Sequence, residues 1–96
     1  MAPTATIIQP IEKEQIKNLH FPKEEVLPQK TDQVNRLQEI KRALALGNLE
    51  HLKVNIIFID SEGFKKVETT IWGFTEKMII LKQGTLIPVE RVYDII

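Results

Sequence analysis

The stretch from Lys53 to Ile96 limits the fold of this chain more than any other part of the sequence. It is a series of short apolar runs, including VNIIFID, TTIWGF and MIIL, separated by the turn signals SEG, EK and QG. Short runs rich in β-branched and aromatic residues, bounded by such turns, are typical of β-strands. We therefore predict that this half of the chain is a small β-sheet domain.

The turn signals divide this half into five predicted strands, at residues 53–60, 64–75, 78–82, 85–87 and 92–96. Gly63 and Gly84 suit turns that require positive φ. The second strand is too long to stay flat, and Gly73 predicts a bend or bulge within it. The VER sequence at 89–91 fits a single helical turn before the last strand.

Residues 31–46 precede the strands and are predicted to form an amphipathic helix. Thr31 or Asp32 can cap its start, and Gly47 suits the left-handed position after its end. A stripe at three- and four-residue spacing is expected to face the sheet. Its members are Val34, Leu37, Ile40, Ala43 and Leu44.

Residues 1–30 hold most of the prolines of the chain and are predicted to form a flexible or loosely docked arm. The remaining residues, 31–96, are predicted to form one domain of a helix and a small β-barrel. Disordered tails are poor in large apolar residues, so this arm could instead lie on another subunit. Its large apolar residues are Ile7, Ile8, Ile16, Leu19 and Phe21.

The segment VNIIFIDSEGFKKVETTIWGFTEKMIILKQGTLIPVERVYDI resembles the SH3-like and Sm-like small barrels. It is more loosely similar to Rho-binding antitermination regulators and to the barrel of WYL-type regulators. The whole chain also resembles a small bacterial family of uncharacterised function. The resemblance implies an α+β fold, with one amphipathic helix followed by a five-stranded, antiparallel, partly open barrel. It carries no binding residue over to this chain.

Composition excludes several classes of protein. The 13 basic and 13 acidic residues cancel, whereas nucleic-acid binders usually carry a basic excess, so nucleic acid is not the favoured partner. The absence of cysteine excludes a disulfide scaffold. Uncharged runs fall short of the roughly 20 residues that span a bilayer, and no signal peptide is recognisable. We expect a cytoplasmic protein without a membrane partner.

No arrangement of residues predicts catalysis or a bound cofactor. His20 and His51 are not at metal-ligand spacing. Asp60, Ser61 and Glu62 resemble a fragment of a cation-binding loop, but a hairpin turn explains them better. Since no nucleophile and base stand out, we predict a protein that is not an enzyme and has no cofactor or metal.

Apolar residues on both faces of the first strand lead to the main functional hypothesis. One helix can cover only one face of a sheet, and a monomer rarely leaves a large apolar face exposed. Ile57, Ile59 and Trp72 are therefore predicted to form a surface for self-association as a homodimer and for a protein partner.

The alternative hypothesis is an RNA-binding or transcription-linked regulatory barrel. An exposed aromatic ring can stack on bases while lysines contact phosphates. Lys65, Lys66, Trp72 and Lys82 are the residues predicted for this role.

Overall fold

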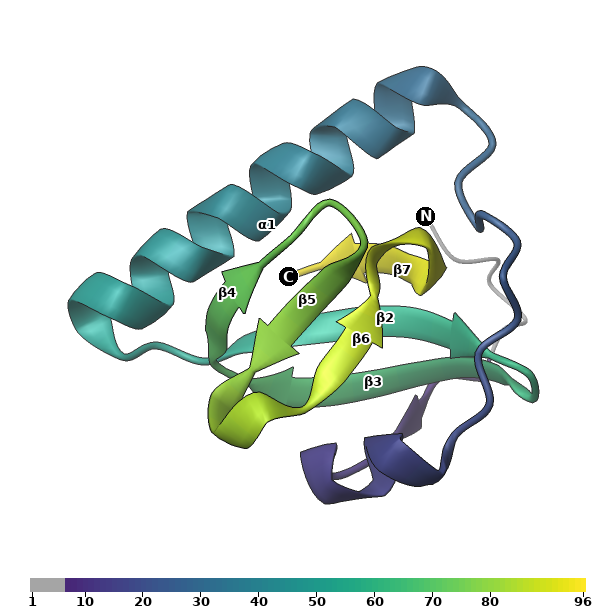
Figure 1. Cartoon of the computed structure of the whole chain (residues 1–96), viewed down its shortest axis with the longest axis horizontal. Helices are drawn as coiled ribbons and strands as arrows, with labels where there is room; N and C mark the ends of the chain where they lie inside the picture. The colour runs from purple at the N-terminus through teal and green to yellow at the C-terminus, as the bar shows by residue number, and fades with distance from the viewer. Residues whose placement is uncertain (1–6) are drawn as a thin grey trace.

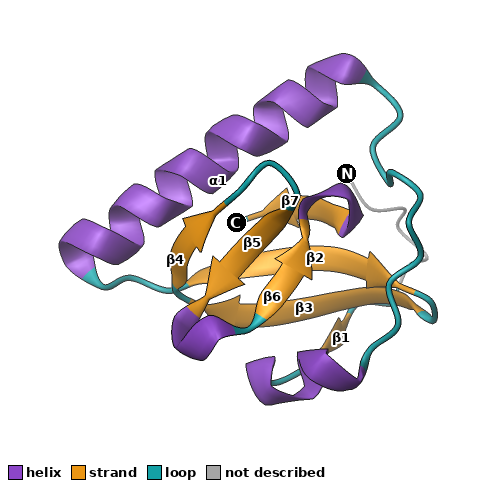
Figure 2. Cartoon of the chain, viewed as in Figure 1, coloured by secondary structure: helices purple, strands orange, loops and turns teal. Residues whose placement is uncertain are grey.

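The structure is a computed structural model that describes residues 7–96. It has one long helix and two β-sheets, which confirms the predicted α+β class (Figures 1 and 2). The helices are η1 (Lys13–Asn18), α1 (Lys30–Glu50), η2 (Lys82–Gly84) and η3 (Val89–Arg91), of which all but α1 are 3-10 helices. The strands are β1 (Gln9–Pro10), β2 (Val54–Asp60), β3 (Gly63–Thr69), β4 (Ile71–Phe74), β5 (Met78–Leu81), β6 (Leu86–Pro88) and β7 (Val92–Ile95).

The strands form a four-stranded sheet in the order β1-β3-β2-β7 and a three-stranded sheet in the order β4-β5-β6. All pairs are antiparallel except β1 with β3, which is parallel. Within residues 7–96 no strand pairing joins the two sheets into a closed barrel. The structure therefore differs from the predicted five antiparallel strands, because the arm adds β1 and the predicted second strand is divided in two.

That division occurs at Thr70, between β3 and β4. Lys65, Val67, Thr69 and Ile71 all remain on the buried side, as their alternation predicts. The carbonyl of Thr70 accepts a hydrogen bond of 3.1 Å from the backbone N–H of Lys82, outside either sheet ladder. The strand thus passes from one sheet to the other while it keeps the same face toward the core.

A β-bulge follows directly in β4. Ile71 lies opposite Leu81 and Gly73 lies opposite Ile80, so Trp72 is an extra residue in the ladder. A bulge increases the local twist and redirects side chains. The irregularity predicted from Gly73 is therefore present, and Trp72 is the residue without a ladder partner.

Helix α1 continues one turn beyond its predicted end at Gly47, and that prediction was wrong. A Cβ atom at Gly47 would lie 2.8 Å from Cγ2 of Thr70 and 2.9 Å from the carbonyl oxygen of Ile71. The glycine is therefore needed for the close approach of the helix to the chain, not for a left-handed end. His51 takes the left-handed conformation instead, with φ of 56°.

The buried face of α1 also differs from the predicted stripe. Its buried residues are Arg36, Ile40, Ala43 and Gly47. Val34 and Leu37, which were predicted to face the sheet, are exposed. The small residues Ala43 and Gly47 let the helix lie close to the sheet along this line, which turns Val34 and Leu37 outward.

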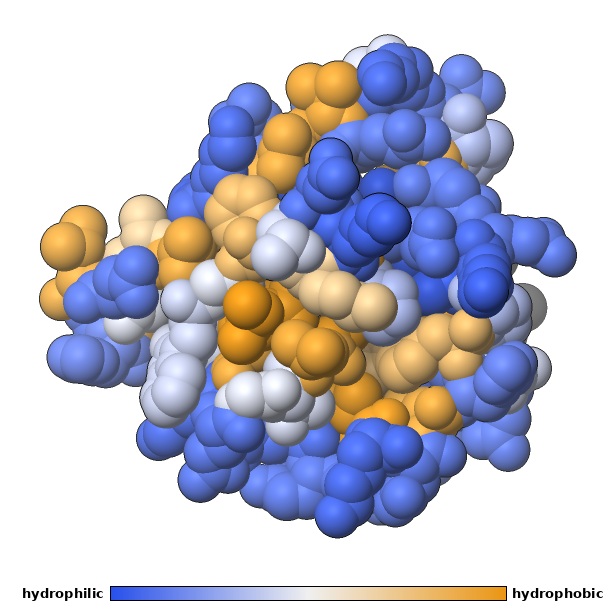
Figure 3. Space-filling view, viewed as in Figure 1, coloured by the Kyte–Doolittle hydropathy of each residue, from blue (hydrophilic) through white to orange (hydrophobic). Residues whose placement is uncertain are grey.

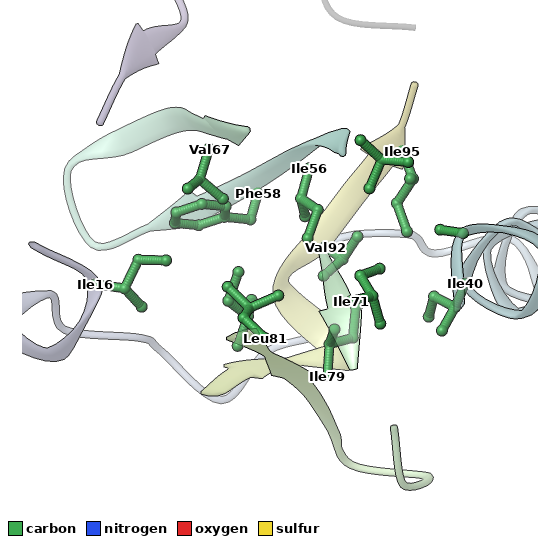
Figure 4. Packing of buried hydrophobic residues seen from close by; sticks show 13 residues of the cluster. Ile16, Ile40, Ile56, Phe58, Val67, Ile71, Ile79, Leu81, Val92 and Ile95 are labelled. Atoms are coloured by element: carbon green, nitrogen blue, oxygen red, sulfur yellow. The ribbon is translucent and has the colours of Figure 1, made fainter. Parts of the chain in front are cut away.

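The hydrophobic core lies between the two sheets and is closed on opposite sides by η1 and α1. Figure 4 shows Ile16 of η1 pointing toward Phe58 and Leu81 from one side, and Ile40 of α1 lying on the other. Ile16 is fully buried, and Leu19 and Phe21 pack against the core. The described part of the predicted arm, residues 7–30, thus contributes to the core of its own chain.

Residues 19–29, here called the strap, connect η1 to α1 along one side of the molecule (Figure 1). The carboxylate of Glu25 accepts two hydrogen bonds from the Arg36 guanidinium, at 2.6 and 2.7 Å. Buried Arg91 donates to the carbonyls of Glu24 and Ile59, both at 2.8 Å. The strap is therefore attached both to α1 and to the end of β2.

Candidate functional site

The predicted partner-binding residues do not form one surface. Ile57 is only 7% exposed. Phe64 of β3 and Tyr93 of β7 meet edge to face at 5.2 Å, and β2 lies between their strands. Their contact therefore crosses β2 on the face that carries Ile57 and half-buried Ile59. Phe64 lies opposite Ile59, whereas Ile57 lies opposite Lys66 and Asp94. Ile57 is buried within its own chain, away from the surface at which a partner would contact it.

Two of the predicted basic residues also lie away from any common site. Lys65 is 4% exposed, and its ammonium lies 3.2 Å from Oδ1 of buried Asp60. The same oxygen accepts hydrogen bonds from the backbone N–H groups of Glu62 and Gly63, which fixes the hairpin turn. Lys65 is therefore a structural residue. Lys66 is half-buried on β3, and its carbonyl accepts a bond from the arm.

Trp72 and Lys82 are the two predicted residues that the structure brings together. They line an open cleft of about 530 Å³, here called the basic cleft. Its full lining is Gly47, Asn48, His51, Lys53, Thr70, Trp72 and Lys82. Trp72 is 52% exposed, so about half of this residue is accessible to a ligand.

Three chain segments build the basic cleft. The end of α1 and the residues after it supply His51 and Lys53, the strand switch supplies Thr70 and Trp72, and η2 supplies Lys82. Because Gly47 has no side chain, the end of α1 can approach the strand switch closely. The hydrogen bond from the Lys82 N–H to the Thr70 carbonyl joins the second to the third.

The electrostatic character of the basic cleft is set by unpaired cations. Neither Lys53 nor Lys82 forms an ion pair with another residue in the range 7–96. His51 adds an imidazole that can donate a hydrogen bond, and Asn48 and Thr70 add neutral polar groups. The carbonyl end of α1 carries a partial negative charge, which the two lysines outweigh. The cleft is suited to an anionic group beside an aromatic ring.

An apolar surface adjoins the basic cleft on the outer face of the β4-β5-β6 sheet. Gly73, Ile80 and Leu86 lie in register across the three strands. Gly73 adds no side chain to this row, and a Cβ atom there would lie 3.7 Å from Cδ1 of Ile80. We call this surface the apolar platform, and it consists of Trp72, Gly73, Met78, Ile80, Leu86 and Pro88.

The apolar platform is partly open to solvent, with two exposed and four half-buried residues. Leu86 is 48% exposed, and Trp72 is 52% exposed. Figure 3 shows apolar residues gathered over β5 and β6 at the centre of this face, with hydrophilic residues around them. Exposed apolar surface with a polar border is characteristic of interaction sites.

Sequence reasoning missed Lys53 and His51, because their positions depend on where α1 ends. It also missed Ile80 and Leu86, although alternation with buried Ile79, Leu81 and Ile87 places them on the outer face.

Comparisons with protein-family models, with curated proteins and with solved structures found no match to this chain. Among residues 7–96, no group of three or more His, Cys, Asp or Glu side chains could hold a metal ion. The described helices include none of the length and apolarity that a membrane crossing requires.

Proposed function

We propose that this protein is a non-enzymatic interaction module that associates with a second copy of itself through the apolar platform. The outward-facing row of Gly73, Ile80 and Leu86 beside Trp72 is the observation that carries the proposal. Leu86 and Trp72 are exposed, and the other two residues are half-buried. Burial of apolar side chains contributes about 25 cal/mol per Å² removed from water, and it is the main driving force for such an association.

A second copy is the occupant that best fits this surface. An apolar sheet face can pack on its own image about a twofold axis, with the sheets about 10 Å apart as in a β-sandwich. The formal net charge of zero leaves little electrostatic repulsion between two copies.

We further propose that β2 to β7 form an opened variant of an SH3-like small barrel. The support is the continuous β3–β4 segment that switches sheets at Thr70, together with the single turn of η3 before β7. The pairing of β7 with β2 brings the last strand back to the first strand after α1.

Light scattering over a range of concentrations tests the self-association. At about 100 micromolar we expect a dimer, which corresponds to an affinity that a small apolar interface can supply. Leu86→Glu places a charge in the centre of the platform and should raise the dimer dissociation constant at least about tenfold.

Leu49→Glu is the matched control, because Leu49 is an even more exposed leucine at the end of α1, outside the platform. This variant should dimerise like the unmodified protein. A wild-type chain that stays monomeric at every concentration contradicts the proposal. Equal effects of the two substitutions would place the interface elsewhere, which contradicts it also.

A further inference from the structure

We propose that the basic cleft binds the phosphorylated nucleobase unit of a nucleotide or of a single-stranded RNA. The base would stack on the accessible part of Trp72, and the phosphate would lie between Lys53 and Lys82. This site does not rest on the proposed self-association, because five of its seven lining residues lie in α1, η2 and the adjoining loops, and only Trp72 belongs to both surfaces.

The aromatic part of the cleft suits a base. Stacking of a base on an aromatic side chain is favourable and tolerates any base, because every base has a π-face. The bulge at Trp72 removes this residue from the ladder, and Gly73 beside it contributes no side chain. The cleft volume of about 530 Å³ is in the usual range of small-molecule sites.

The cationic part of the cleft suits a phosphate. Lys53 and Lys82 have no carboxylate partner among residues 7–96, so a bound anion need not displace an existing ion pair. Asn48, His51 and Thr70 can supply further hydrogen bonds to phosphate or sugar oxygens. Only two lysines take part, so binding needs no large basic excess and is compatible with the formal net charge of zero.

Fluorescence of Trp72 tests this proposal directly, because Trp72 is the only tryptophan in the sequence. We expect saturable quenching when adenosine monophosphate or a short single-stranded RNA is added at low salt. Saturation by adenosine monophosphate would identify a free nucleotide as sufficient, and saturation by the RNA alone would identify a strand. Either result supports the site, whereas no saturable quenching by either probe overturns it.

Charge reversal separates specific binding from general attraction. Lys82→Glu should weaken binding at least about tenfold, since a hydrogen bond to a charged group is worth about 1.5–3 kcal/mol. Lys66→Glu changes the net charge equally, but Lys66 does not line the cleft, so this control should bind within about twofold of wild type. Equal weakening by both variants overturns the site.

The two proposals can fail separately. Leu86→Glu should disrupt the dimer and should leave nucleotide quenching intact at dilutions where the wild type is monomeric, because Leu86 does not line the cleft. Lys82→Glu should weaken nucleotide binding and leave the dimer intact. Circular dichroism of each variant shows whether it has kept its fold. Trp72→Phe retains an aromatic face, so it should preserve nucleotide binding, which calorimetry can detect.

Discussion

At the scale of single residues, Gly47 determines how closely α1 approaches the strand switch. A side chain at this position would clash with the backbone carbonyl oxygen of Ile71, which cannot move aside as a flexible side chain can. The pattern around Gly47 is also that of a helix end, and sequence alone does not distinguish these two uses of glycine. The close approach of Gly47 to Thr70, which lies 23 residues further along the chain, shows that this glycine serves close packing and not a helix end.

Gly47→Ala should therefore destabilise the fold, although alanine is favoured over glycine by about 1 kcal/mol in an exposed helix. Overpacking of this kind typically costs about 1–3 kcal/mol, so we expect a lower midpoint in urea denaturation. Asn48→Ala is the control, because its side chain is exposed on the same turn and should leave the midpoint nearly unchanged. A stabilised Gly47→Ala variant would contradict the close approach.

The candidate site was predictable residue by residue only in part. Trp72 and Lys82 were found as an aromatic and a basic residue of the β half. The burial of Lys65 was also readable, because it alternates onto the same face as Val67 and Ile71. The ion pair of Lys65 with Asp60 could not be predicted from the sequence, because it depends on the geometry of the hairpin turn.

At the scale of elements, the strap shows why residues 1–30 were hard to interpret. Prolines broke any periodic pattern there, so the only signal for an ordered segment was its large apolar residues. Its order comes in part from Leu19 and Phe21, which pack against the core. Polar contacts with distant residues add to this, chiefly Glu25 with Arg36 and the N–H of Val26 with the Glu90 carbonyl. The β strands, by contrast, were predicted nearly to their ends, because their turns and alternation are local signals.

The strap should make stability depend on acid pH. Burial alone would raise the pKa of Glu25, but hydrogen bonds from Arg36 and from the Leu27 N–H hold this pKa below its ordinary value of 4.5. A carboxyl whose pKa is lower in the folded state stabilises the fold above the unfolded pKa. This contribution is lost as the pH falls from about 4.5 through the folded pKa.

We expect the urea midpoint to fall over this range in the wild type and to fall less steeply in Glu25→Gln. Glu24→Gln is the matched control, because the side chain of Glu24 is exposed and makes no hydrogen bond within residues 7–96. If Glu25→Gln and wild type show the same pH dependence, the ion pair with Arg36 does not hold the strap.

At the scale of the whole molecule, the basic cleft and the apolar platform meet at Trp72. A dimer formed through the platform would cover the indole face that a base requires, so the two events should compete. Linkage requires that each weaken the other by the same factor. Sedimentation of the protein with adenosine monophosphate should therefore show a shift toward monomer.

Inorganic phosphate is the control for this competition, because it can occupy the lysines without covering Trp72. It should shift the monomer–dimer equilibrium much less than the nucleotide does. A nucleotide that binds and yet leaves the dimer dissociation constant unchanged would contradict a shared role of Trp72.

The fully buried Ile16 has a consequence for how the chain acquires its fold during synthesis. Residues 7–30 leave the ribosome before the strands that Ile16 packs among, and Arg91 of η3 donates a hydrogen bond to the carbonyl of Glu24. Pairings so distant along the chain form slowly, because closing long loops costs entropy before the pairings stabilise the structure. Residues 7–30 can therefore complete their packing only after β7 has been synthesised. Until then their apolar side chains are exposed and accessible to chaperones.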